Sequence, residues 1–328
     1  MASGRRVTVY VLRRLAHAVP IVIGIVVLNF LLLQLAPGDA ATVLAGEAGG
    51  APPEYVESLR QRFGLDQPVS IQLLLYLKNV LMLDLGYSFR HGMPVLRLIV
   101  DRLWPTLLLM SATLVVSVGS GVLLGLLAAT RLNSWRDNLI SVVSIVAYAT
   151  PLFWVGLMLI LVFSIKLDWF PTTGMEDVVA FNEGWARVVD IAHHLVLPTI
   201  TLSLFYMALY TRLMRAAMLD QRGMDYVITA RAKGLNERQI TRRHVLRNAV
   251  LPVVTMAGVQ VGSLLGGSVV VESVFAWPGL GSLAFQSLFA RDFNLLLGIF
   301  FLSACLVVVV NLAVDLVYTA LDPRIATR

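Results

Sequence analysis

Apolar residues run along this chain in six long blocks that are separated by polar or charged segments. The first block extends from Leu15 to Leu35, and the others are Trp104–Thr130, Asn138–Ile165, Leu195–Thr211, Asn248–Val271 and Phe293–Val314. Their lengths are close to the roughly 20 residues that a helix needs to cross the hydrocarbon layer of a bilayer. The pattern predicts an all-α membrane protein with six transmembrane helices.

The first block follows basic residues, as the apolar part of a cleaved signal peptide also does. It is longer than the about 7–15 apolar residues of such a peptide, so a retained first helix is the favoured interpretation. Composition supports membrane spans as well. The mean hydropathy is +0.78 and only 14% of the residues are charged, whereas soluble domains have about 25%.

The net charge of +6 is explained better by Lys and Arg retained on the cytoplasmic side of a membrane protein than by nucleic-acid binding. With the N-terminus inside, the inner segments hold 17 of the 26 Lys and Arg residues, and the outer segments hold nine. Six of those nine lie in the long segment 37–103, which has little weight in this rule. We therefore expect both termini to be cytoplasmic.

These assignments divide the chain into three parts. They are the cytoplasmic N-terminus and first helix (1–36), an extracytoplasmic segment (37–103), and a five-helix core (104–328) that contains a cytoplasmic loop at 214–248. The segment 37–103 is too long for a plain connection. We predict a helix that starts near Pro53 and an apolar, membrane-associated helix within 70–83. The segment is either a small cap over the outer mouth or a passive linker.

Glycines recur at a spacing of four residues in two blocks. The fifth block contains Gly258, Gly262 and Gly266, and the second contains Gly121 and Gly125. Such stripes allow another helix backbone to approach closely. On the fifth helix the stripe serves either tight packing alone or the rocking of this helix beside a central pathway.

Ionisable residues are nearly absent from the interior of the blocks. Glu272 and Asp315 fall at block ends, where we expect water to reach them. Carriers driven by protons or sodium commonly use deep carboxylates or broken helices, so such a carrier is disfavoured. The chain has no protease motif and no phosphate-binding GxxxxGK[ST] loop, and its one cysteine is Cys305. We expect no catalytic residue, no metal site and no nucleotide bound by this chain itself.

The loop 214–248 is rich in basic residues, and its sequence predicts two short helices at an angle. Asp225 is a candidate N-cap of the first helix, and Gly234 is suited to end it in the left-handed conformation. A rigid, capped loop with small residues suits insertion into a groove of another protein. The alternative is a basic segment that lies at the membrane interface and only fixes the orientation of the chain.

The second predicted helix of this loop has its own start signals. Asn236 and Gln239 have the spacing of a capping box, and Leu235 and Ile240 have the spacing of a hydrophobic staple. These signals predict a fixed angle between the two helices.

The segment YVITARAKGLNERQITRRHVLRNAVLPVVT resembles the cytoplasmic signature loop of ABC-importer permeases of the dipeptide, oligopeptide and nickel type. Three other segments are similar to the same family, in the same order: LAPGDAA, RFGLDQPVSIQLLLYLKNVLMLDLGYSFRHGMPVLRLIVDRLWPTLLL and VFAWPGLGSLAFQSLFARDF. The loop departs from the general importer motif, because Ile228 stands in place of a glutamate and Thr229 in place of the first alanine. The TARAKG form is similar to that of the peptide subfamily.

The resemblance implies a multi-pass permease subunit of an ATP-driven importer in the bacterial cytoplasmic (inner) membrane. It implies as partners a second homologous permease subunit, two cytoplasmic ATPase subunits that bind ATP and Mg²⁺, an extracytoplasmic substrate-binding protein, and membrane lipid. The residues that it assigns to the ATPase-coupling contact are Asp225, Tyr226, Ala230, Arg231, Ala232, Gly234 and Leu235. It also implies a tight outer turn at Pro278–Gly281, to which we assign no chemistry.

Di- or oligopeptides are the favoured substrates, but the same family includes importers of glutathione, nickel and some sugars. Two other functions stay open from the residues alone. One is a stand-alone secondary carrier or channel for small solutes, and the other is a membrane scaffold that docks a cytoplasmic partner without transport.

Overall fold

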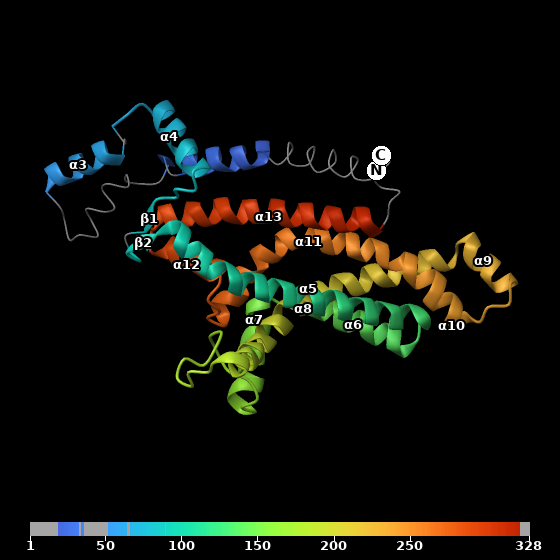
Figure 1. Ribbon diagram of the computed structural model, residues 1–328. Coiled ribbons are helices and arrows are strands. Elements are labelled where there is room, and N and C mark those ends of the chain that lie inside the picture. The colour runs from blue at the N-terminus through green and yellow to red at the C-terminus, as the bar shows by residue number, and fades with distance from the viewer. Residues whose placement is uncertain (1–18, 33, 36–51, 64–65, 89, 322–328) are drawn as a thin grey trace. The chain divides into compact units, whose positions relative to one another are not determined.

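The computed structural model describes residues 19–32, 34–35, 52–63, 66–88 and 90–321, which are almost entirely helical (Figure 1). They form two compact units. One unit combines Met1–Arg102 with Ala284–Arg328, and the other is Leu103–Leu283. The predicted basic N-terminus, the first residues of the predicted first span and the C-terminal tail lie outside the described residues.

The first unit contains the apolar helix Val19–Leu32 and short elements of the predicted outer segment. Its elements are α3 (Pro53–Phe63), α4 (Val69–Leu81), the antiparallel pair β1 (Tyr87–Ser88) and β2 (Met93–Pro94), and α13 (Phe293–Leu321). The two predicted helices of the outer segment are confirmed as α3 and α4. A small core joins Val26, Val80 and Phe301, so α4 packs against the helix Val19–Leu32 and against α13.

The second unit is built around the long helix α8 (Gly184–Arg222), which packs against α6, α7 and α11. Its other elements are α6 (Trp135–Ala149), α7 (Leu152–Leu159), the π-helical segment η1 (Ile160–Lys166), α9 (Asp225–Ala232), α10 (Glu237–Ile240), the π-helical segment η2 (Thr241–Val245) and α11 (Leu246–Val274). Two helices, α5 (Val95–Thr130) and α12 (Leu280–Phe289), have residues in both units.

Four helices among the described residues are long and apolar enough to cross a membrane. They are Val95–Thr130, Gly184–Arg222, Glu237–Val274 and Phe293–Val314. The fourth predicted span was too short, because the helix there has 39 residues. The described part of the first predicted span includes only the shorter apolar helix Val19–Leu32.

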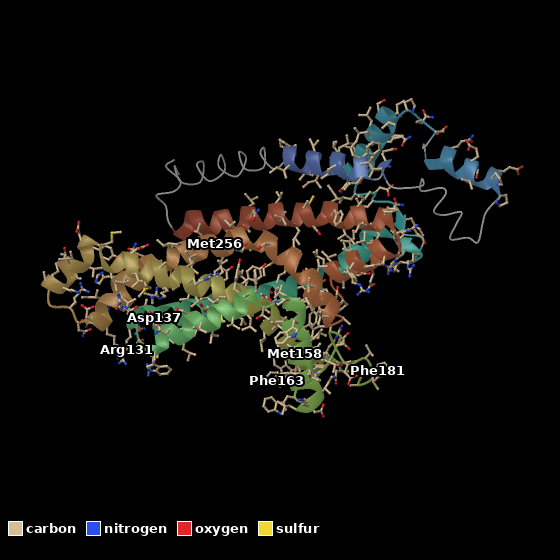
Figure 2. All side chains as sticks on the ribbon, turned by 180° about the vertical axis from the view of Figure 1, so that it is seen from behind. Arg131, Asp137, Met158, Phe163, Phe181 and Met256 are labelled. Carbon is tan, nitrogen blue, oxygen red and sulfur yellow. The ribbon has the colours of Figure 1, made fainter. Side chains whose placement is uncertain are left out.

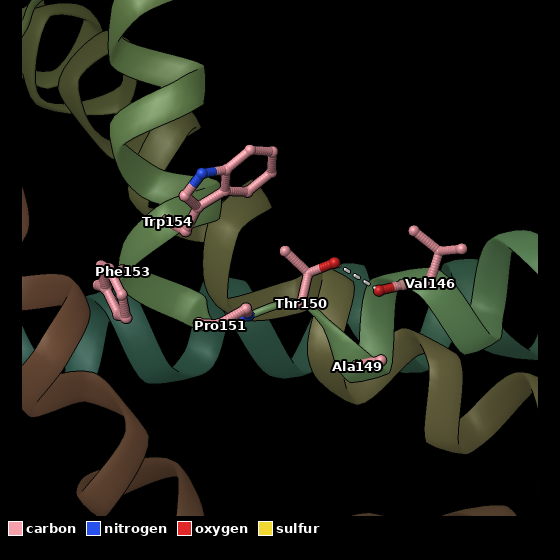
Figure 3. A pocket seen from close by; sticks show the side chains of 6 residues that line it. All are labelled: Val146, Ala149, Thr150, Pro151, Phe153 and Trp154. Atoms are coloured by element: carbon pink, nitrogen blue, oxygen red, sulfur yellow. Dashed lines mark hydrogen bonds between the residues drawn. The ribbon is translucent and has the colours of Figure 1, made fainter.

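The third predicted span, Asn138–Ile165, is wrong as a single helix. The chain breaks there into α6 and the α7–η1 pair, which are bent by 104°. Thr150 is extended (φ −81°, ψ 131°), as steric contact with the following Pro151 favours. An apolar pocket of about 450 Å³ lies at the break and is lined by Val146, Phe153 and Trp154, among others (Figure 3). Counting the bent pair as one, the described helices provide up to five spans.

The predicted glycine stripe of the second block is confirmed as a close contact between α5 and α8. A Cβ atom added at Gly121 would lie 2.5 Å from the Cβ atom of Tyr210, and one at Gly125 would lie 2.6 Å from that of Met214. Real Cβ atoms do not approach so closely, so α5 and α8 can only pack in this way if both positions are glycine.

We expect Gly125→Ala to destabilise the second unit, because the added methyl group would also lie 2.7 Å from the backbone oxygen of Thr211. Overpacking of this kind costs about 1–3 kcal/mol. Thermal denaturation of the purified protein in detergent measures the effect. Gly119→Ala is the matched control, since nothing lies within 4 Å of its added Cβ. Equal melting temperatures for the two variants would contradict the predicted contact.

The glycine stripe of the fifth block is less uniform than predicted. Gly258 is buried, Gly262 is half-buried and Gly266 is exposed, with nothing within 4 Å of a Cβ added at Gly266. The neighbouring Gly267 is the residue that faces α8, because its added Cβ would lie 3.3 Å from Leu202. Close approach of another helix backbone at Gly266 stays a prediction.

Candidate functional site

The loop predicted at 214–248 is mostly helical and much shorter than expected. Helix α8 continues to Arg222, and α10, η2 and α11 form one helix from Glu237 to Val274. Only residues 223–236 connect them, and we call this connection the elbow. The elbow consists of α9 with a short turn on either side (Figure 1).

The start of α9 differs by one residue from the prediction. Met224 is the N-cap and provides no side-chain hydrogen bond, whereas Asp225 is the first helical residue. The negative charge of Asp225 there complements the positive end of the helix dipole. Tyr226 donates a hydrogen bond from its hydroxyl to Oε1 of Gln221 at 2.7 Å, which ties α9 to the last turn of α8.

The end of α9 is fixed by glycine as predicted. Gly234 has φ +78°, its N–H donates to the carbonyl of Arg231 at 2.9 Å, and the N–H of Leu235 donates to the carbonyl of Ala230 at 3.3 Å. These two bonds form a Schellman motif, which satisfies carbonyl groups at the helix end.

The next helix begins with the predicted capping box. The N–H of Gln239 donates to Oδ1 of Asn236 at 2.9 Å, and the N–H of Asn236 donates to Oε1 of Gln239 at 3.3 Å. Ile240 is buried, but its staple contact with Leu235 stays a prediction. Because both ends of this turn are capped, the elbow holds a fixed angle.

The burial pattern of α9 corrects one assignment of the sequence analysis. Val227 and Ala230 are buried, at 0% and 5% exposure, so Ala230 packs inside this chain and is not open to a partner. Met224 and Ile228 are exposed instead, at 45% and 57%. They are four residues apart and therefore share one face of the helix.

The elbow and the helix after it also carry exposed charged residues. Arg231 of α9 donates to Glu237 of α10, with Nε and Oε1 2.6 Å apart. The hydrogen bond to Glu237 and the negative charge of that residue raise the pKa of Arg231 above its ordinary value, so Arg231 is charged. The pair is exposed and contributes little to stability, but it bridges the two helices of the elbow. Other exposed basic residues are Lys233, Arg238, Arg242, Arg243 and Arg247.

Two arginines of α8 fasten the turn between α5 and α6. Arg215 forms a bidentate pair with Asp137, with its Nε 2.7 Å from Oδ1 and its Nη2 2.8 Å from Oδ2. Arg222 donates from Nη1 to the carbonyl of Ala129 at 2.7 Å. Sequence analysis missed this pair, because no spacing rule links residues 78 positions apart.

Glu272 was expected to be reached by water, and this expectation is wrong. The side chain is fully buried in the second unit. Its carboxylate accepts hydrogen bonds from Thr106 Oγ1 and from the N–H of Ser282, each at 2.9 Å. Thr106 Oγ1 in turn accepts from the N–H of Leu280 at 2.7 Å. The carboxylate therefore binds the N-terminal end of α12 and joins it to α5.

The predicted outer turn at Pro278–Gly281 packs directly on this carboxylate. A Cβ atom added at Gly279 would collide with the Glu272 carboxylate, and one at Gly281 would lie 2.6 Å from the Cα atom of Val269. Both glycines are therefore needed for this packing. The turn itself ends at Gly279, because Leu280 and Gly281 already belong to α12.

Within the described ranges, no group of three or more His, Cys, Asp or Glu side chains is arranged to hold a metal ion. The elbow combines capping bonds at the end of α9 and at the start of α10 with the exposed apolar pair Met224 and Ile228.

Comparisons with known protein families identify the chain along most of its length. The family model "Binding-protein-dependent transport system inner membrane component" matches residues 121–327. A second model, "Binding-prot-dependent transport system membrane comp, N-term", matches residues 7–110.

Several curated proteins are similar over their whole length. The oligopeptide transport system permease protein AppB of Bacillus subtilis is 42% identical, and the alignment covers 96% of this chain and 98% of AppB. A putative peptide transport system permease protein of Brucella abortus is 37% identical, with 97% and 99% covered. The glutathione transport system permease protein GsiC of Escherichia coli is 39% identical, with 96% and 98% covered.

Among solved structures, inward-facing conformations of the MetNI methionine ABC transporter have a similar fold. Two crystal forms give TM-scores of 0.53 and 0.55 at 20% and 19% identity, and each covers 69% of this chain and 96% of the matched chain. This similarity concerns the fold alone. The family models and the curated relatives show that the chain belongs to the binding-protein-dependent transport system inner membrane components, the non-catalytic permease subunits of bacterial ABC transporters.

Proposed function

We propose that this chain forms half of the translocation pathway of an ATP-driven peptide importer and is coupled to an ATPase subunit through its elbow. The observation that carries the proposal is the exposed apolar pair Met224 and Ile228 at the start of α9. The C-terminal end of this helix is fixed by the Schellman bonds, and the next helix begins directly afterwards with a capping box. Exposed apolar side chains on a rigid helix are typical of a protein interface. The curated relatives AppB and GsiC are named as peptide and glutathione permeases, which supports peptides as substrates.

The proposed assembly contains a second, homologous permease, two ATPase subunits and an extracytoplasmic binding protein. ATP and Mg²⁺ are bound by the ATPases. The elbow lies in a cleft of one ATPase, and closure of the ATPase pair moves it as a lever between two states. The proposal includes six spans with both termini in the cytoplasm, because this topology would put the elbow on the ATPase side.

The ATPase contact, revised for burial, is formed by the exposed face of α9. It includes Met224, Asp225 and Ile228, with Arg231 and Ala232 at its edge. Gly234 and Leu235 set the angle of the helix, and Tyr226 attaches it to α8. Ala230 lets α9 pack closely on the rest of the chain.

Purification of the tagged chain from its native membrane tests the proposal. We expect a second permease and two ATPase copies to co-purify, and we expect ATP hydrolysis to rise when the binding protein loaded with a di- or oligopeptide is added. The matched control is the same preparation with unloaded binding protein. Purification without any ATPase, or peptide uptake that continues without one, would overturn the proposal.

A further inference from the structure

Asp137 is a buried carboxylate at the start of α6, with 2% of its side chain exposed. It is held by the two hydrogen bonds of Arg215 and by a third from the N–H of Asn133 at 3.0 Å. Arg215 is partly exposed, at 31% of its side chain, so only the carboxylate of the pair is buried. The best-attested use of a buried charge that is paired in this way is to fix one arrangement of elements. The pair therefore points to a required position of α6 against α8.

Arg222 holds the other side of the same turn. Its guanidinium lies at the carbonyl end of α5, where it donates to Ala129 and where a positive charge is favoured by the helix dipole. Arg215 and Arg222 are seven residues apart and so lie on the same face of α8. They fasten the residues on both sides of the turn 131–134 to one helix.

The elbow is attached to this same end of α8. Arg222 is the last residue of α8, and α9 begins three residues later, with the hydrogen bond from Tyr226 to Gln221 between them. Figure 2 shows Asp137 and Arg131 toward the end of the unit that carries the elbow, and Met158 and Phe163 on the segment beyond the break. Displacement of the elbow therefore acts on α8 next to the Asp137–Arg215 pair.

Helix α6 connects this pair to the break at Thr150 and Pro151. It has 15 residues and is therefore about 22 Å long, which is shorter than the roughly 30 Å hydrocarbon layer. Its far end lies at the 104° bend and at the apolar pocket beside it (Figure 3). Because α6 is one continuous helix that packs against α8, we expect a displacement at its Asp137 end to be carried to its other end.

We propose that the Asp137–Arg215 pair is a positioning contact that passes movement of the elbow through α6 to the break at Thr150 and Pro151. This inference rests on the proposed function, because it needs an ATPase that moves the elbow. Neither side chain touches the substrate. They hold α6 to α8, so that the break and its pocket change together with the nucleotide state of the ATPases.

Asp137→Asn tests the contact with little change in side-chain size. The complete transporter is reconstituted in proteoliposomes, and basal ATP hydrolysis and peptide imported per ATP are measured. We expect basal hydrolysis to stay within about twofold of wild type and peptide per ATP to fall about tenfold, a usual size of coupling between sites. Unchanged peptide per ATP in this variant would overturn the inference.

A second carboxylate–arginine pair provides the matched control. Glu176 and Arg187 form a bidentate contact, with distances of 2.5 and 3.1 Å, but neither residue touches the elbow end of α8. Glu176→Gln should leave peptide per ATP unchanged, and an equal loss in both variants would also overturn the inference. Peptide-stimulated ATP hydrolysis by the wild-type complex tests the proposed function separately in the same preparation.

If the Asp137→Asn transporter does not assemble, distances between spin labels test whether α6 and the elbow move together. Cysteines replace Leu139 on α6 and Lys233 at the end of α9, both of which are exposed, in a Cys305→Ser background. We expect one distance distribution in the nucleotide-free and vanadate-trapped wild-type complex, because the pair makes α6 and the elbow move together. Two separate distributions would show that they move independently.

Discussion

Replacement of Glu272 by alanine is expected to remove most of the folded protein. The N–H of Ser282 and the hydroxyl of Thr106 would lose a buried acceptor, and the truncated side chain would leave a cavity. Each unsatisfied donor costs about 1–3 kcal/mol, and a large-to-small change in a core costs about 2–5 kcal/mol. The sum is comparable to the whole stability of a typical domain, about 5–15 kcal/mol.

The measurement is the melting temperature and the monodisperse yield of the purified chain. Ser273→Ala is the matched control, because the neighbouring Ser273 is exposed and donates only to Val269 of its own helix. The melting temperature of Ser273→Ala should differ little from that of the wild type. Glu272→Gln should be intermediate, since it keeps an acceptor oxygen but brings an amide group next to the N–H of Ser282. If Glu272→Ala and Ser273→Ala had the same melting temperature, the Glu272 carboxylate would not be holding α12.

Replacement of Ile228 by arginine is expected to release the ATPase while leaving the chain folded. The side chain is 57% exposed, so the free chain tolerates a charge there. In the proposed contact the guanidinium would be buried without a partner. A central interface residue contributes about 2 kcal/mol or more, so we expect recovery of the ATPase with the tagged chain to fall at least about tenfold.

Val179→Arg is the control for this substitution. Val179 is another exposed β-branched residue, at 81%, and lies in the connection between η1 and α8, outside the elbow. Quantitative immunoblotting of the ATPase in both preparations makes the comparison, with chain abundance in the membrane measured in parallel. Full recovery of the ATPase with Ile228→Arg, or equal loss with Val179→Arg, would remove Ile228 from the contact.

The local chemistry of the elbow could be read from the sequence. Gly234 ends α9 and Asn236 and Gln239 start the next helix, as predicted, because every bond involved joins residues at most five positions apart. Near neighbours in the sequence did not predict which face of α9 is exposed. Ala230 is buried and Ile228 is exposed because of the elements that pack against α9, and neighbours in the sequence do not determine these.

The prolines of the predicted spans also show a feature that the sequence alone does not decide. Pro105, Pro151, Pro198 and Pro252 all fall within predicted spans or at their edges, and each removes a backbone donor. Three of them lie inside continuous helices, and only Pro151 marks a sharp break. Membrane helices tolerate proline where surrounding groups satisfy the freed backbone.

The sequence by itself determined the apolar blocks, the capped elbow and the family resemblance, because these depend on composition and on contacts between near neighbours. The tertiary structure alone decided the burial of Glu272, the pairing of Asp137 with Arg215 and the bend at Pro151. Thr106, which donates to Glu272, and Arg215, which donates to Asp137, lie 166 and 78 residues away along the chain. The environment of these two carboxylates is fixed only when separate helices pack together, and that packing determines whether a charged group at a helix end meets water or the protein interior.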